Sequence, residues 1–305
     1  MALDGVSGQA DEEASPQAAD PDAERPDLAE VRHRHSFGLD ENRPEAVAKR
    51  HALGCRTARE NIEDLCDAGS FTEFGALAVA AQRGRRSLDD LIRSTPADGM
   101  VTGTARGGGE PCVVMSYGYT VLAGTQGLHN HRKTDRMLEL AEERRLPVVL
   151  FAEGGGGRAG DTDTTAVAGL DVTTFQRMGR LRGLVPLVGV VSGRYFAGNA
   201  ALLGCCDVVI ATPEASIGMG GPAMTEGGGL GAYRPEEVGP LSVQMPNGVV
   251  DIAVADEAEA VRTARRYLSY FPRPQGSCTT CGRWWAGWPT AGPCWSCGPG
   301  SASGC

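Results

Sequence analysis

The sequence has few aromatic residues, few histidines and no long apolar run. Aromatic residues make up 6% of the 305 residues, and there are five histidines. No stretch reaches the roughly 18 consecutive apolar residues of a membrane-spanning helix, and no basic start followed by an apolar stretch marks a signal peptide. Positive charge is also scarce, because the formal net charge is −9, which disfavours nucleic-acid binding. We expect a cytoplasmic protein with neither a membrane nor a nucleic acid as partner.

The negative charge gathers at the N-terminus. Residues 1–30 hold nine acidic side chains and one basic side chain. This part of the chain shows no apolar periodicity, so it buries too little surface to offset the entropy of ordering it. The composition therefore predicts a disordered acidic tail over residues 1–43.

Short β-rich runs then alternate with amphipathic helical patterns up to residue 271. Helical spacing is seen in four segments, of which the first holds one or two helices: 44–67, 133–145, 173–184 and 257–270. Continuous runs of β-branched and other apolar residues, typical of strands buried on both faces, lie at 112–117, 147–152, 185–191 and 208–211. Strands that alternate with helices indicate an α/β domain.

Glycine-rich segments follow two of these expected strands, and the sequence shows no convincing pair of nucleophile and base. Residues 153–158 read EGGGGR and residues 193–200 read GRYFAGNA. A strand that ends in glycines and turns into a helix exposes backbone N–H groups, and two such turns side by side can aim donors at one oxygen. The pattern thus indicates a backbone oxyanion hole. Simple tight turns remain the alternative, whereas phosphate-loop motifs are absent from the sequence.

Residues 192–219, SGRYFAGNAALLGCCDVVIATPEASIGM, resemble the pattern of the crotonase superfamily. Three further segments, at 50–75, 124–158 and 247–271, resemble the N-terminal half of the carboxyltransferase (beta) subunits of biotin-dependent acyl-CoA carboxylases. The resemblance covers about residues 44–271. It implies an α/β, crotonase-like β-β-α superhelix that forms a single domain with disordered termini.

The resemblance also implies a function and a set of site residues. In the family, carboxybiotin on a partner protein releases CO2, biotin takes the α-proton of a short acyl-CoA (acetyl-CoA or propionyl-CoA), and the enzyme holds the thioester enolate. The backbone N–H groups assigned to this role by position are those of Gly155, Gly156, Ala197 and Gly198. The side chains expected to bind the CoA ester are His131, Lys133 and Arg158. The implied partners are a biotin carboxylase, a biotin carrier and further copies of the chain.

This sequence departs from the family at three positions near the site. Glu153 stands where the family has Asp, Gly154 where it has Ser, and Asn199 where it has Gly. Hydratase or isomerase activity is less favoured than carboxyl transfer, because neither Glu214 nor Glu226 has the expected Gly-x-Pro-Glu context. The resemblance is also compatible with decarboxylation of a malonyl-type CoA and with a non-catalytic CoA-ester-binding remnant.

The last part of the chain, residues 272–305, is rich in Cys and Trp. Its spacing of Cys278, Cys281, Cys294 and Cys297 is that of a four-cysteine zinc ribbon. Two observations argue against zinc. The family continues at this point into a second half that binds carboxybiotin. In addition, the codons possible for residues 294–298 encode Leu-Glu-Leu when they are read with a shift of two bases, and a similar stretch occurs in that second half. We therefore favour an out-of-frame or unstructured segment over a zinc site. A chain without the second half is expected to have impaired transfer activity.

Overall fold

The computed structural model describes residues 24–163 and 172–272. The α-helices are α1 (Pro26–Ser36), α2 (Pro44–His51), α3 (Ala58–Leu65), α4 (Leu88–Ser94), α5 (Leu128–Arg144), α6 (Thr174–Leu181), α7 (Gly198–Leu203), α8 (Pro222–Gly227), α9 (Leu241–Gln244) and α10 (Glu257–Leu268). The strands are β1 (Thr72–Phe74), β2 (Met100–Gly107), β3 (Glu110–Tyr117), β4 (Val148–Gly154), β5 (Leu187–Phe196), β6 (Val208–Ala211), β7 (Ser216–Gly218) and β8 (Ile252–Ala253). Short 3-10 helices include η1 (Asp40–Asn42), η2 (Pro96–Gly99) and η3 (Leu122–Gly124).

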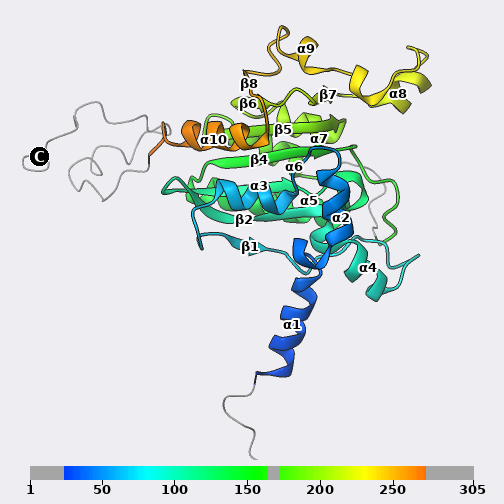
Figure 1. The fold of residues 1–305 in the computed structure, drawn as a ribbon, viewed down its shortest axis with the longest axis vertical. Coiled ribbons are helices and arrows are strands. Elements are labelled where there is room, and N and C mark those ends of the chain that lie inside the picture. The colour runs from blue at the N-terminus through cyan, green and yellow to red at the C-terminus, as the bar shows by residue number, and fades with distance from the viewer. Residues whose placement is uncertain (1–23, 164–171, 273–305) are drawn as a thin grey trace, which may run out of the picture.

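One eight-stranded sheet organises the chain (Figure 1). Its strands lie in the order β1-β2-β3-β4-β5-β6-β8, and β7 pairs with the far end of β5. The pairs β1–β2 and β2–β3 are antiparallel, whereas β3 to β6 and β8 run parallel. The carboxyl ends of β4 and β5 therefore lie next to each other, which is where parallel α/β sheets place their ligand sites.

Helices cover both faces of this sheet. Met137 and Leu138 of α5 and Met178 of α6 pack in one buried cluster with Val113 and Met115 of β3. The alternate residues of the same strand, such as Val114, face a second cluster with α3 and α10. Because both faces are buried, the strands read as continuous apolar runs, and the expected strands at 112–117, 147–152 and 208–211 are all found.

The N-terminal segment differs from the expected disorder where the structure describes it. Helix α1 occupies Pro26–Ser36 and extends away from the sheet (Figure 1). It buries no residue, so the apolar pattern could not reveal it. Its signals are instead at its ends, with Pro26 and Asp27 in the first turn and basic residues in the last turn, which suit the helix dipole. Residues 1–23 of the predicted N-terminal tail lie outside the described residues, as do Cys278, Cys281, Cys294 and Cys297 near the C-terminus.

The second glycine-containing segment also differs in part from its prediction as a turn. Strand β5 continues past the expected end at residue 191 and runs to Phe196, because Arg194, Tyr195 and Phe196 pair with β7. The turn therefore begins at Ala197 rather than at Gly193. Strand β4 has a register shift between Ala152 and Gly154.

Candidate functional site

The turns that follow β4 and β5 touch each other at the carboxyl edge of the sheet. Gly156 has φ +94°, and a β-carbon placed on it would lie 2.8 Å from the β-carbon of Ala197. Ala197 itself has φ +54°, a conformation that L-residues rarely adopt, and it leads directly into α7. The two turns that carry Gly155, Gly156, Ala197 and Gly198 are thus in contact.

The four amides are not equivalent. The amide of Gly155 donates to the carbonyl of Ala123 at 3.3 Å, and the amide of Ala197 donates to Gly218 at 3.0 Å. Within the described residues, the amides of Gly156 and Gly198 donate to no protein acceptor. Gly198 is the first residue of α7, where a helical N–H has no partner in its own helix. One N–H from each turn is therefore left for a ligand oxygen.

A third turn, which the sequence analysis missed, supports the other two. In η3, Leu122 and Ala123 have φ +47° and +53°, although neither is glycine. A β-carbon on Gly124 would lie 2.6 Å from the carbonyl oxygen of Glu153. The buried side chain of Asn199 donates from Nδ2 to the Gly124 carbonyl at 3.3 Å. Asn199, one of the departures from the family pattern, therefore links α7 to this turn.

Two buried tyrosines and Gln126 lie beside α7, and neither tyrosine is available as a base. Gln126 donates from Nε2 to the hydroxyl of Tyr117 at 2.9 Å, and the Tyr117 and Tyr195 rings meet edge to face at 6.0 Å. Burial raises the pKa of both phenols. Both tyrosines are therefore neutral at physiological pH and are suited to packing and hydrogen bonding rather than to proton abstraction.

A buried ion pair lies at the end of β4. The guanidinium of Arg50 binds both carboxylate oxygens of Glu153 at 2.8 and 2.9 Å. Burial raises the pKa of Glu153, and Arg50 opposes this only in part. The pair fixes α2 against the register shift that precedes the Gly155–Gly156 turn, so the carboxylate is engaged in structure rather than directed at a substrate.

Two of the three side chains expected to contact the CoA ester, those of His131 and Arg158, border one cavity of about 430 Å³, which Gln126 and Arg132 also line. The Nδ1 of His131 lies 3.0 Å from the hydroxyl of Thr174. Burial lowers the pKa of His131, so the imidazole is neutral at physiological pH and suits hydrogen bonding better than charge pairing.

Lys133 is placed differently from the prediction. Its side chain is buried, and the ammonium donates to the carbonyl of Ala97 at 2.9 Å and to that of Met100. Burial lowers its pKa to about 8. Position in the sequence suggested a contact with the CoA ester, but Lys133 instead ties α5 to η2.

Arg158 is likewise buried and fully partnered, although it was expected to bind the CoA ester. Its guanidinium pairs with Asp98 and with Asp161 at 3.6 Å, and donates to the carbonyl of Thr125 at 2.8 Å. The same two carboxylates accept the amides of Leu128 and Asn130 in the first turn of α5. Arg158 therefore anchors the start of α5.

The zinc alternative remains a prediction, because its four cysteines lie outside the described residues. Within residues 24–163 and 172–272, no group of three or more His, Cys, Asp or Glu side chains is placed to hold a metal ion. Over the same residues, no helix combines the length and apolarity needed to cross a membrane.

The mixed, mainly parallel sheet, the helices on both faces and the paired backbone turns define a crotonase-like fold, which solved carboxyltransferases share. The profile of the carboxyl transferase domain matches residues 49–281. The chain belongs to the carboxyl transferase domain family.

Individual relatives agree with this assignment. The chain is 30% identical to the biotin-dependent long chain acyl-coenzyme A carboxylase beta4 subunit of Mycobacterium tuberculosis, over 80% of this chain and 45% of that protein. It superposes on a single-chain, multi-domain long-chain acyl-CoA carboxylase with a TM-score of 0.77 and 64% identity, covering 82% of this chain and 25% of that one.

The transcarboxylase 12S structure, solved with methylmalonyl-coenzyme A bound and described as a hexamer, gives a TM-score of 0.68 at 27% identity. That match covers 81% of this chain and 47% of the other. The chain thus spans about half the length of the curated relatives it matches.

Proposed function

We propose that this chain takes part in carboxyl transfer from carboxybiotin to a short acyl-CoA, by holding the thioester oxygen of the substrate between two backbone turns. The observation that carries the proposal is the pair of amides, Gly156 and Gly198, which have no protein acceptor although their turns are in contact. The names of the relatives, which are carboxylase and carboxyltransferase subunits, support an acyl-CoA as substrate, and two of these relatives are named for long-chain acyl-CoA.

The chemistry of the acyl-CoA follows from these donors. When the α-proton leaves the acyl group, the thioester becomes an enolate and negative charge gathers on its oxygen. Amides that already point at that oxygen stabilise it without reorganisation, and one such donor is typically worth about 10²–10³ in rate. The α-carbon then forms a bond to CO2 and the thioester carbonyl is restored.

The chain supplies position and electrostatics rather than an acid or a base. Bound carboxybiotin would release CO2, and the biotin that remains would take up the α-proton, so the protein itself needs no general base. This agrees with the neutral phenols of Tyr117 and Tyr195 and with the engagement of Glu153 by Arg50. The implied partners are a biotin carboxylase and a biotin carrier, with further copies of this chain.

The proposal is tested by carboxylation with the partner proteins present. Purified chain is mixed with biotin carboxylase, biotinylated carrier, ATP, labelled bicarbonate and either acetyl-CoA or propionyl-CoA. Label in malonyl-CoA or methylmalonyl-CoA is the expected result. Binding of the acyl-CoA without any labelled product would overturn transfer and leave a CoA-ester-binding protein. Loss of CO2 from added malonyl-CoA without a carrier would identify a decarboxylase.

A further inference from the structure

A cavity of about 430 Å³ lies between the start of α5 and the residues that follow β4. Gly157, the residue after Gly156, lines this cavity, and so does Gln126. The Oε1 atom of Gln126 lies 2.6 Å from the position that a β-carbon on Gly198 would take. The cavity therefore begins beside both turns of the proposed thioester site, so an acyl group held at that site has this space within reach.

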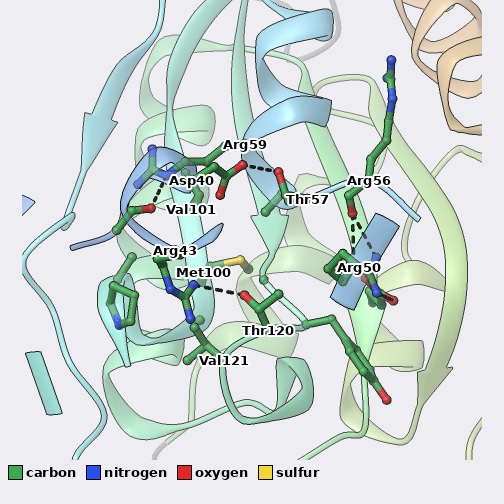
Figure 2. A pocket seen from close by; sticks show the side chains of 18 residues that line it. Asp40, Arg43, Arg50, Arg56, Thr57, Arg59, Met100, Val101, Thr120 and Val121 are labelled. Carbon is green, nitrogen blue, oxygen red and sulfur yellow. Dashed lines mark hydrogen bonds and ion pairs between the residues drawn. The ribbon is translucent and has the colours of Figure 1, made fainter. Parts of the chain in front are cut away.

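A smaller cavity beside Arg50 has a volume of about 40 Å³ (Figure 2). Arg50 donates there to the carbonyl of Arg56 at 3.1 Å, and Arg43 donates to the hydroxyl of Thr120 at 3.1 Å. A volume of this size holds a few water molecules at most, since one water needs about 10–15 Å³. We therefore expect an acyl chain to occupy the larger cavity.

The ionised side chains that line the larger cavity balance one another. They are two arginines and two aspartates, namely Arg132, Asp135, Arg158 and Asp161. Arg158 and Asp161 pair at 3.6 Å. The carboxylate of Asp135 accepts two hydroxyls, those of Thr173 and Thr174. Equal numbers of positive and negative charges favour neither an anion nor a cation, so this cavity suits a neutral group.

Hydrogen bonds determine which ring nitrogen of His131 carries the proton. The single hydroxyl hydrogen of Thr174 is donated to Asp135. The Thr174 oxygen therefore accepts the hydrogen bond that joins it to Nδ1 of His131 at 3.0 Å, which places the imidazole proton on Nδ1. Because burial lowers the pKa of His131, the ring is neutral at physiological pH and its Nε2 atom carries a lone pair. Nε2 is thus a hydrogen-bond acceptor.

Ring contacts place this imidazole next to the thioester site. The His131 ring meets the Phe175 ring edge to face, with the centroids 6.0 Å apart. The tip of the Phe175 ring lies 3.1 Å from the position that a β-carbon on Gly198 would take. One aromatic side chain therefore connects His131 to the turn that carries the Gly198 amide.

Two acceptors on residues that line this cavity have no protein donor. Gln126 uses its Nε2 atom to donate to Tyr117, which leaves its Oε1 atom as an acceptor. Within residues 24–163 and 172–272, neither Oε1 of Gln126 nor Nε2 of His131 accepts a hydrogen bond from the protein. An apolar chain that displaced water from these atoms would leave them without a donor, whereas a hydroxyl would replace that water. The free acceptors therefore favour a neutral group that donates a hydrogen bond.

We propose that this cavity selects an acyl group that carries a hydroxyl beyond its α-carbon, with Nε2 of His131 as the acceptor of that hydroxyl. The inference rests on the proposed function, because the thioester oxygen of the same substrate would lie between the amides of Gly156 and Gly198. It narrows the substrate class from a short acyl-CoA to a short hydroxyacyl-CoA. His131 acts here in substrate selection, and no substrate bond is made or broken at it.

The test measures calorimetric affinity for three CoA esters with the same carbon chain: butyryl-CoA, 3-hydroxybutyryl-CoA and 4-hydroxybutyryl-CoA. His131→Phe keeps an aromatic ring against Phe175 and removes the acceptor. His131→Gln places an amide oxygen close to the position of Nε2. The matched control is His33→Phe, because His33 also meets a phenylalanine ring edge to face, that of Phe37 at 4.9 Å, and lies outside the cavity.

A hydroxyl that satisfies one such acceptor is worth about tenfold in affinity. We expect at least one hydroxybutyryl-CoA to bind about tenfold more tightly than butyryl-CoA to the wild-type chain, to His131→Gln and to His33→Phe. In His131→Phe, both hydroxybutyryl esters should fall to the affinity of butyryl-CoA. The affinity for butyryl-CoA itself should stay unchanged, which also shows that this variant is folded.

The contrary outcomes separate this inference from the proposed function. Equal affinities of the three esters for the wild-type chain would overturn the inference while the proposed function stands. A preference for a hydroxyl that survives in His131→Phe would overturn the role of His131. Weakening of all three esters by the same factor in His131→Phe would assign His131 to the CoA part that they share, and would overturn the selection of the acyl group. Absence of binding of all three esters to every protein would overturn the proposed function and the inference with it.

Discussion

Gly156 and Ala197 are in such close contact that a β-carbon on Gly156 would lie 2.8 Å from the β-carbon of Ala197. The two residues come from different strands, so their contact sets the spacing between the turn after β4 and the start of α7. Gly156 also has a φ of +94°, a backbone conformation that would be strained for any residue other than glycine. Sterics and backbone conformation thus both require glycine at this position.

We therefore predict that Gly156→Ala pushes the two turns apart. The backbone strain alone is expected to cost about 1–3 kcal/mol of stability. The displaced amide should also reduce carboxylation by about 10²–10³ if one oxyanion donor is lost. Urea unfolding and the labelled-bicarbonate assay measure the two effects.

Gly157→Ala is the matched control for this substitution. Gly157 has ordinary φ and no atom within 4 Å of its added β-carbon. It should change stability by less than about 0.5 kcal/mol, as surface substitutions usually do. If Gly156→Ala behaves like Gly157→Ala in both assays, the two turns do not form the proposed site.

The sequence was sufficient to predict the elements whose signal is burial on both faces. The strands at 112–117 and 208–211 are apolar runs, and they are found where the runs occur. Helix α1 escaped prediction because it buries nothing and is marked by its ends alone. The positive φ of Leu122 and Ala123 leaves no mark on the sequence, since tertiary contacts impose it on residues that do not favour it.

The sequence was sufficient to predict the backbone turns of the candidate site, but not the placement of the charged side chains around it. Glycines after buried strands indicate turns, and these turns do meet at Gly156 and Ala197. A basic residue in the sequence does not show whether it faces water or a carboxylate. The side chains of Lys133 and Arg158 are therefore buried in the fold, although their positions in the sequence assigned both to the CoA ester.

Because Arg158 is part of a buried network, we expect its removal to destabilise the fold rather than to weaken ligand binding directly. Arg158→Met would leave the fully buried carboxylate of Asp98 without its cation, which typically costs about 3–5 kcal/mol. The exposed pair of Arg180 with Glu142 is the control, and Arg180→Met should cost no more than about 1 kcal/mol. Denaturant unfolding measures both. A stable Arg158→Met protein with greatly weakened CoA binding would restore Arg158 as a ligand contact.

Lys133 predicts a pH dependence of stability at alkaline pH. Its pKa in the fold is about 8 and its ordinary value is 10.5. Between these values the unfolded chain binds more protons than the folded chain, so the contribution of Lys133 to stability rises with pH. The rise is about 3 kcal/mol at most. We expect wild-type stability to increase relative to Lys133→Met between pH 8 and pH 10.

The sequence offers an internal control, because Lys49 and Lys133 are its two lysines. Spectra of protein labelled at lysine should show two side-chain signals in the described fold. One of the two signals should titrate near pH 8 and vanish in Lys133→Met. A Lys133 signal that titrates above pH 10 would contradict the buried placement of this residue.

The pair of Arg50 and Glu153 predicts strong coupling in a double-mutant cycle. Both side chains are nearly buried, at 6% and 12% exposure, and they share two hydrogen bonds. Arg50→Met leaves a buried carboxylate and should cost about 3–5 kcal/mol, whereas Arg50→Met with Glu153→Met removes both charges and should recover most of that loss. Unfolding free energies of the four proteins give the coupling. Additive single substitutions would mean that Arg50 does not hold α2 to the end of β4, and that the Gly155–Gly156 turn is positioned without this pair.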